Sequence, residues 1–293
     1  MPGVRVDDIL AIFRQDCEIS IPKDRMENFK EAAKRIGQVI RGCRGDSDRF
    51  AETLRGEEIP HLSFSQVTTV EFCEYRYYLQ YIEKKEPVPF PDYFTKGKLL
   101  HQLIADTYEM IRNGSENGSV SVEYRIANMC IGDNKRHLVN AYHVHQANLW
   151  VGFKVADVEH PFVMEIDDEL PPMVGVIDLV LKQNGHFVLV DHKSGRNFYP
   201  YDELQVAIYK KYIQAAYQGA DCRLYYDHYR WVNNLDRIRK PAFQRTEVSV
   251  DGSSWPGYLK RIQQAYAIIR NIKNGMAPSR GGECFRCPYR KSC

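Results

Sequence analysis

The hydrophobic pattern divides the chain into a helical first half and a mixed second half. Helix-forming composition or helical apolar spacing marks four early segments, 22–44, 63–83, 94–114 and 134–150. The polar stretch 45–60 is expected to be a connector. We therefore expect residues 1–60 to form a helical N-terminal extension and residues 61–293 to form the main domain.

After residue 150 the pattern changes to short runs rich in β-branched and aromatic residues, at 153–166, 173–182 and 186–192. The last two runs are joined by Asn184-Gly185, a dipeptide typical of a tight hairpin turn. A helix, two strands and a second helix are predicted to follow, at 201–219, near 222–232 and 245–250, and at 254–274. This alternation predicts an α/β fold.

Composition places the chain among ordinary globular proteins, with 293 residues, 44% of them hydrophobic and 27% charged. Its 40 basic and 38 acidic residues nearly balance, so a nucleic-acid surface would have to be a local patch. The N-terminus lacks a basic segment followed by a long apolar one, and no window has the length and apolarity of a membrane span. We expect a soluble, cytoplasmic protein with no membrane partner.

The hairpin carries the first candidate chemistry. If the Asn184-Gly185 turn sets the register, Asp178 lies opposite Asp191. Opposed carboxylates destabilise a sheet unless something binds between them, and Mg²⁺ or Mn²⁺ suits such an oxygen-rich site. Strand alternation puts Lys193 on the face of Asp191 and His192 on the other face.

A lysine beside such a metal can stabilise charge on a phosphate oxygen or orient a water molecule. The set therefore indicates metal-assisted phosphodiester hydrolysis. An isolated D-x-K is far more often a plain ion pair at a strand end. The hairpin and the second aspartate favour the catalytic interpretation here.

Three motifs in order extend this interpretation: Gly175-Val176-Ile177-Asp178, then Asp191-His192-Lys193-Ser194-Gly195, then Gln205-Val206-Ala207-Ile208-Tyr209. The sequence resembles the RecB-like branch of the PD-(D/E)XK nuclease superfamily, with Ile177 in place of the usual proline. The resemblance implies a restriction-endonuclease-like core, in which helices flank a mixed sheet.

The resemblance also implies roles for single residues. His101, in "GKLLHQLI", would bind the metal together with Asp178 and Asp191, and the main-chain carbonyl of His192 would be a further ligand. Lys193 would position the attacking water. A lone helical histidine is more often structural, so the case for His101 depends on the ordered set of motifs.

Further contacts follow from the same resemblance. Glu165 corresponds to an additional acid near the site, although a solvated strand glutamate is almost as common. Gln205 and Tyr209 share a helix face and would contact DNA. Arg76, among the tyrosines of "EYRYYLQY", suits contact with a single strand.

Three of the eight cysteines, Cys284, Cys287 and Cys293, fall in the last ten residues. With the distant Cys73 they could bind zinc or an iron-sulfur cluster. The arrangement resembles the iron-sulfur branch of these nucleases, which includes CRISPR-associated exonucleases, the AddB nuclease domain and the exonuclease V type. It implies a 4Fe-4S cluster that closes a C-terminal tail.

Taken with the resemblance, these motifs predict a Mg²⁺- or Mn²⁺-dependent deoxyribonuclease, an exonuclease on single-stranded DNA or DNA ends. One alternative is an end-processing subunit of CRISPR spacer acquisition that works with an integrase. Another is a catalytically quiet DNA-end binding module. A helicase partner would have to supply translocation, because the chain has no G-x-x-x-x-G-K-[ST] motif. The motifs leave open cleavage polarity, endo or exo action, DNA or RNA preference, oligomeric state, and the pathway, DNA repair included.

Overall fold

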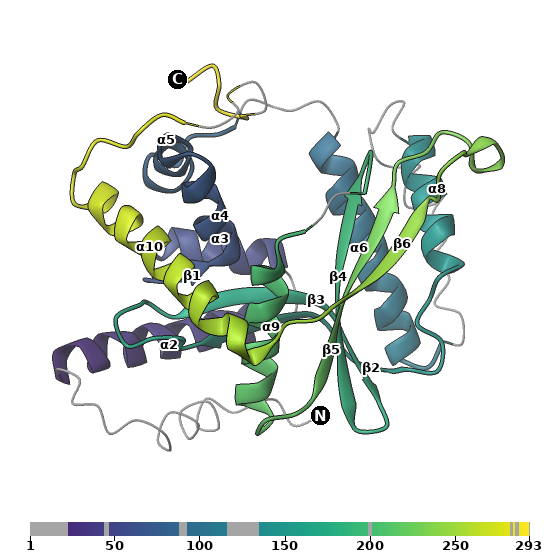
Figure 1. The fold of residues 1–293 in the computed structure, drawn as a ribbon, viewed down its shortest axis with the longest axis horizontal. Helices are drawn as coiled ribbons and strands as arrows, with labels where there is room; N and C mark the ends of the chain where they lie inside the picture. Colours follow the sequence, from purple (N-terminus) through teal and green to yellow (C-terminus); the bar gives the residue numbers. More distant parts are fainter. Residues whose placement is uncertain are drawn as a thin grey trace.

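A six-stranded mixed sheet forms the centre of the molecule, with helices on both faces (Figure 1). The computed structural model describes residues 23–43, 47–87, 93–115, 135–198, 201–281, 284 and 287–292. The predicted α/β class is confirmed, and the flanked mixed sheet is consistent with a restriction-endonuclease-like core. No described helix has the length and apolar character needed to cross a membrane.

The sheet has the strand order β1-β3-β4-β5-β6, and β2 also pairs with β3. The pairs β1–β3 and β4–β5 are parallel, and the other three pairs are antiparallel. The strands are β1 Leu62–Ser63, β2 Lys154–Met164, β3 Met173–Gln183, β4 His186–Gly195, β5 Cys222–Arg230 and β6 Phe243–Val248.

The β3–β4 hairpin has the register that the turn predicted. Asn184 and Gly185 have φ angles of 50° and 85°, and the ladder runs from Gln183↔His186 to Leu179↔Val190. Beyond that pair β4 follows β5, whereas β3 pairs with β1 at Met173 and Val174. Among the described strands, residues 175–178 of β3 therefore have no ladder partner on this edge. The gap leaves room for side chains, and the candidate site is built there.

Two helical layers cover the sheet (Figure 1). Apolar side chains of α4 (Phe64–Phe72), α9 (Glu203–Ala216) and α10 (Trp255–Lys273) share one core with the sheet. Those of α6 (Tyr93–Arg112) and α8 (Lys135–Gln146) share another core with it. Successive side chains of β4 therefore point into different cores: Leu189 lies in the first core and Val190 in the second.

The expected connector at 45–60 is wrong, because Ser47–Gly56 forms helix α3 after helix α2 (Lys23–Cys43). Phe50 and Leu54 are one helical turn apart, and both pack with Ile36 of α2 against Val163 of β2. Two buried side chains are enough to fix this helix in an otherwise polar segment.

The predicted helix 63–83 is interrupted at Cys73, which is extended with φ −168°. The Ser63 side chain caps α4 by accepting a hydrogen bond from the Gln66 N–H at 3.2 Å. Cys73 then separates α4 from α5 (Glu74–Tyr77), which continues as the π-helix η1 (Tyr78–Ile82). Short 3₁₀ turns, η3 (Leu235–Arg237) and η4 (Gly252–Ser254), complete the described elements.

One arginine ties the helices of the first layer together. Arg261 of α10 donates from Nε to Glu71 of α4 at 2.6 Å and from Nη1 to Asp202 at 2.7 Å. Asp202 also caps α9, accepting from the Leu204 N–H at 3.0 Å. This link fixes the start of α9, the helix that carries Gln205 and Tyr209.

Candidate active site

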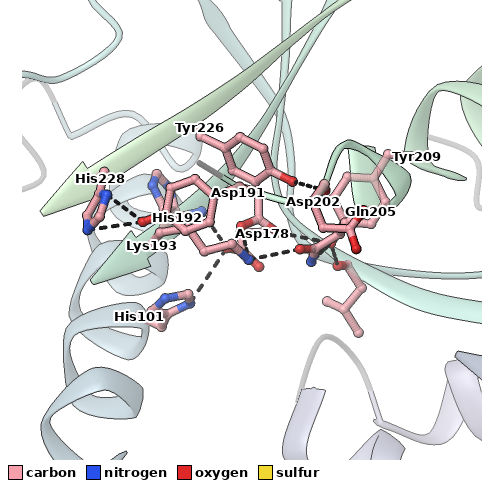
Figure 2. A network of polar contacts seen from close by, with 12 residues as sticks. His101, Asp178, Asp191, His192, Lys193, Asp202, Gln205, Tyr209, Tyr226 and His228 are labelled. Carbon is pink, nitrogen blue, oxygen red and sulfur yellow. Dashed lines mark hydrogen bonds and ion pairs between the residues drawn. The ribbon is translucent and has the colours of Figure 1, made fainter. Parts of the chain in front are cut away.

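The gap between β3 and β4 collects side chains from four elements (Figure 2). His101 comes from α6, Asp178 from β3, and Asp191 and Lys193 from β4. Gln205 and Tyr209 approach from α9. The structure thus brings together residues that are up to 108 positions apart (209 − 101).

Three of the side chains could hold one cation. His101, Glu159 and Asp178 each offer a ligand atom, and these atoms all lie within 4.8 Å of one another. His101 Nδ1 is 3.6 Å from Asp178 Oδ2. Ligands on opposite sides of a Mg²⁺ ion are about 4.2 Å apart, so small side-chain movements would close this group around an ion.

Glu159 reaches the group through the pairing of β2 with β3. The pairs Val158↔Leu179 and His160↔Ile177 put Glu159 level with Asp178. Its φ of 48° is unusual for a residue with a side chain, and the register shift of β2, between Val155 and Asp157, lies just before it. Such local strain is typical of functional positions.

Electrostatics also favours a cation here. Burial, with the nearby charges of Asp191 and Glu159, raises the pKa of Asp178 well above its usual value. Burial lowers the pKa of His101 to about 4, which keeps its imidazole neutral at pH 7. A neutral imidazole beside crowded carboxylates is a donor set that fits a divalent metal.

Lys193 lies next to this group in a polar network (Figure 2). Its Nζ is 2.5 Å from Asp191 Oδ2 and donates to Gln205 Oε1 at 2.9 Å. Gln205 donates in turn to the Tyr209 hydroxyl at 2.8 Å. The Tyr209 hydroxyl lies 2.9 Å from the carbonyl of Val176, in the unpaired stretch of β3, and 3.2 Å from Asp191 Oδ1. The network holds the lysine head group in place while its side chain remains 26% exposed.

The backbone and the side chain of His192 make contacts on opposite sides of the sheet. Its backbone N–H donates to Asp178 Oδ2 at 2.7 Å, which orients that carboxylate. Its ring lies on the opposite face from Asp191 and Lys193, as alternation predicted, and packs among Tyr108, His145 and Tyr229, with the His101 ring edge-on and its centre 6.3 Å away. Burial keeps the pKa of the His192 ring well below its usual value. The metal-ligand role proposed for its carbonyl stays a prediction.

The structure also separates some predicted residues from this group. Asp191 faces Lys193 and Tyr209 and is not one of the three gathered ligands, so its direct ligation stays a prediction. Glu165 follows the end of β2 with an exposed side chain, and its catalytic role likewise stays a prediction. Sequence reasoning missed Glu159, because no turn sets the register of β2.

The tail cysteines lie partly inside the described residues. Cys73 and Cys287 are buried and Cys284 is exposed, whereas Cys293 lies outside the described residues. The thiols of Cys73 and Cys287 accept backbone hydrogen bonds at 3.4 Å, from the N–H groups of Arg76 and Tyr289. The described sulfur atoms do not form a group within 4.8 Å of one another.

The chain beyond α10 packs against α5 and η1. The Tyr75 N–H donates to the Ser279 carbonyl at 3.0 Å, and the Ser279 N–H donates to Glu74 at 2.9 Å. Cys287 also packs with Leu79 of η1. This brings the tail to the helix that Cys73 caps. Arg76 lies on the same helix, with its guanidinium 5.5 Å from the Phe72 ring centre.

Comparison with known families agrees with this site. The family model of the PD-(D/E)XK nuclease superfamily matches residues 61–293. The chain belongs to the PD-(D/E)XK nuclease superfamily. Membership supports a hydrolytic nuclease, and divalent metals are the cofactors of this superfamily. Helices α2 and α3 lie outside the matched region of this PD-(D/E)XK nuclease.

Solved structures agree at the level of the fold. A protein from Eubacterium rectale that was provisionally named an exonuclease is 10% identical, with a TM-score of 0.52. The match covers 78% of this chain and 86% of that one. A second structure, SSO0001, is 17% identical over 69% of this chain and 98% of its own, with a TM-score of 0.33 that is too low to support an argument. No curated protein matched the chain.

Proposed function

We propose that this protein is a metal-dependent DNA nuclease, acting as an exonuclease on single-stranded DNA or DNA ends. One observation carries the proposal: the His101, Glu159 and Asp178 ligand atoms gather within 4.8 Å. The Asp191–Lys193 ion pair, at 2.5 Å, lies in the same gap of the sheet. A metal site beside a fixed ammonium group suits phosphodiester hydrolysis, because the metal can activate a water and the ammonium can stabilise charge on the phosphate.

Lys193 has a definite part in this chemistry. An ammonium group has three N–H donors; Lys193 donates to Gln205 and forms an ion pair with Asp191. One donor is left for a water molecule or a phosphate oxygen. The lysine can therefore orient the attacking water and stabilise the charge that develops on the phosphate.

The acidic residues and His101 supply the metal site. Mg²⁺ or Mn²⁺, when bound, would polarise the phosphoryl oxygen and lower the pKa of a coordinated water. The neutral His101 ring and the Asp178 carboxylate, held by the His192 N–H at 2.7 Å, would be the fixed ligands. Glu159 would supply a third ligand, from β2.

Single-stranded DNA is supported by a mixture of rings and cations at α5, the start of η1 and the segment after α10. Tyr75 and Tyr78 have ring centres 6.0 Å apart and nearly parallel planes. Arg280 lies 4.8 Å from the Tyr75 ring centre. Aromatic faces beside arginines bind unpaired bases and backbone phosphates without reading sequence.

The direct test is cleavage of single- and double-stranded DNA, labelled at the 5′ or 3′ end, in the presence of Mn²⁺. We expect cleavage by the wild type and a rate at least about 100-fold lower for Lys193→Gln, whose amide can still donate to Asp191. Lys260→Ala, on an exposed part of α10, is the matched control and should cleave normally. Equal rates for the wild type and Lys193→Gln would refute the proposal.

The same assay separates the alternatives. A catalytically quiet module would bind DNA ends and leave both labels intact. Release of short labelled products from one end only would support exonuclease action and give its polarity. Work with an integrase in spacer acquisition, or with a helicase, stays a separate prediction from the sequence resemblance.

The same proposal includes a 4Fe-4S cluster bound by Cys73, Cys284, Cys287 and Cys293. The docking of the tail on α5 supports it, because this places a buried Cys287 near the helix capped by Cys73. Backbone N–H donors to both thiols also fit, because such bonds stabilise a thiolate ligand. Zinc is the alternative metal for the same four thiols.

A further inference from the structure

A cavity of about 320 Å³ lies beside the candidate active site, and residues of α9 and β3 are among those that line it. Gln205 and Tyr209 line it, and the same two residues hold the polar network of Lys193 and Asp191. The cavity is therefore one side chain away from the catalytic lysine. Its size is typical of small-ligand sites.

Aromatic side chains form much of its wall. Phe50, Phe64, Tyr81 and Phe162 all line the cavity, and they come from α3, α4, η1 and β2. Phe162 meets Tyr209 edge to face, with ring centres 5.9 Å apart. Gly175 also lines the cavity and leaves room for the Phe162 ring, because a Cβ at this position would lie 2.5 Å from that ring.

Polar groups are placed among these rings. Gln66 Nε2 lies 3.1 Å from His61 Nε2, and His61 Nδ1 lies 2.7 Å from the Ile59 carbonyl. Because a carbonyl only accepts, Nδ1 carries the proton and Nε2 accepts from the Gln66 amide. Both side chains line the cavity, so a flat, partly polar ligand would find rings to stack on and hydrogen-bond partners at its edge.

We propose that this cavity binds one unpaired nucleobase of the DNA strand being cut, next to the scissile phosphate. The inference rests on the proposed nuclease function and specifies how that site holds its substrate. Stacking on aromatic side chains, with polar groups at the base edge, is how proteins bind bases that have left a duplex. A base held here would place its own phosphate near Gln205 and Lys193.

The proposal gives a role to a part of the chain outside the family match. Phe50, Ala51 and Leu54 of α3 line one side of the cavity, whereas the match begins at residue 61. Helix α3 would then decide which unpaired strand ends are accepted. Double-stranded DNA would have to release a base before cleavage.

Two variants on α3 test this directly. Ala51 is exposed and lines the cavity, so Ala51→Trp should fill its mouth without disturbing the core. Glu52 is exposed and is not part of the lining, so Glu52→Trp adds the same ring one position away. Both variants should unfold at the wild-type temperature.

The substrates are single-stranded oligonucleotides, each with one abasic nucleotide at a different position. For the wild type and Glu52→Trp, an abasic nucleotide beside the cleaved bond should lower kcat/KM by about 5- to 100-fold, the loss expected for one stacked base. In Ala51→Trp, kcat/KM for the intact strand should be lower by a similar factor, and an abasic nucleotide beside the cleaved bond should cause no further decrease. An unchanged abasic effect in Ala51→Trp would overturn the proposal.

A photoreactive base at the sensitive position gives a second measurement that needs no variant. We expect crosslinks to Phe64 or Tyr81 in the wild type, and crosslinks that fall only elsewhere would also overturn the proposal. If the wild type cuts DNA in a Lys193-dependent way but ignores every abasic position, the cavity proposal fails and the nuclease function stands. If Lys193→Gln cuts as fast as the wild type, both fail.

Discussion

The acidic residues around the site differ in what balances their charge. Asp191 has Lys193 at 2.5 Å, and its side chain is only 2% exposed. Asp178 has the His192 N–H and the neutral ring of His101, and its pKa is raised by burial and by the neighbouring acids. Asp178 is therefore the carboxylate for which the structure shows the clearest gain from a bound cation.

Glu159 gives the sharpest prediction at this scale. Because its carboxylate lies in the ligand group, Glu159→Gln should lower Mn²⁺-supported DNA cleavage by about 10- to 100-fold. Glu165→Gln is the comparison variant, at the acid that the sequence resemblance expected near the site; if Glu159 is the acid that the site uses, this exposed residue just past β2 should be replaceable at nearly the wild-type rate. The reverse result would show that the acid expected from the sequence is the functional one.

A buried histidine behind the site predicts a dependence of stability on pH. Burial lowers the pKa of His145 to about 3, and its Nδ1 lies 2.9 Å from the Tyr229 hydroxyl. Because His145 is neutral in the folded state, its contribution to the free energy of unfolding is fully present above the unfolded-state pKa of about 6.5. It is lost as the pH falls from there towards 3.

Between pH 7 and pH 5 the loss from this one histidine should be on the order of 2 kcal/mol. Urea unfolding at the two pH values measures it. In His145→Gln, whose amide can still meet Tyr229, the fall in unfolding free energy should be smaller by that amount. The same fall in both proteins would contradict the assignment of a neutral, buried His145.

At the residue scale, local spacing predicted the part of the site that one hairpin and one helix encode. That Asp178, Asp191 and Lys193 lie together follows from a two-residue turn and strand alternation. The helical step of four put Gln205 and Tyr209 on one face, but only the family resemblance put that face at the site. Glu159 could not be predicted, because the connection between β2 and β3, residues 165–172, has no tight turn that would set the register of β2.

Among the elements, β3 does most to shape the site, because its edge is shared by β1 and β4 and leaves residues 175–178 between them. Gly175 stands in this gap under the Phe162 ring. The glycine of the G-x-x-D motif thus has a packing reason in this chain. Because Gly175 has no side chain, Phe162 of β2 can pack over it and contact Tyr209 of α9 at the cavity wall.

Gly175→Ala should lower the free energy of unfolding by about 1–3 kcal/mol, because its Cβ would lie 2.5 Å from the Phe162 ring. Gly257→Ala in α10 is the control: nothing lies within 4 Å of its Cβ, and stability should be unchanged or slightly higher. Denaturant unfolding of both variants measures the difference. An unchanged stability of Gly175→Ala would show that the ring moves away without cost.

Elements with a strong local signal were predicted and those fixed by distant contacts were not. The hairpin, α9 and α10 lie where turn residues and apolar spacing put them. Helix α3 was expected to be a connector, since only Phe50 and Leu54 mark its buried side and their partners lie in α2 and β2. The break at Cys73 was also missed, because the composition stays helical on both sides of it.

At the scale of the whole molecule, contacts between parts of the chain that are far apart in sequence hold the C-terminal segments against the earlier helices. Arg261 connects α10 with α4 and with the start of α9, and the segment after α10 hydrogen-bonds to α5. The proposed cluster would strengthen this closure by joining Cys73 to the tail. Metal-thiolate bonds that close so long a loop remove much chain entropy from the unfolded state.

The cluster predicts a coloured protein. Anaerobically purified wild type should show visible absorbance and contain iron, and Cys287→Ser should lose both and unfold at a lower temperature. Cys43→Ser is the control, because Cys43 is also buried but packs in the core of α2 and α3. A colourless wild type that contains zinc would contradict the cluster and leave the nuclease site untouched.

The central claim for the whole molecule is that the acids and the histidine in the β3 gap bind the catalytic metal. Titration of Mn²⁺ into the wild type, Asp178→Asn and Asp236→Asn, followed by calorimetry, tests it most directly. Asp236 is an exposed acid in η3 and serves as the control. We predict that Asp178→Asn weakens Mn²⁺ binding by at least about tenfold and abolishes DNA cleavage, while Asp236→Asn binds normally. Wild-type Mn²⁺ affinity in Asp178→Asn would contradict the account.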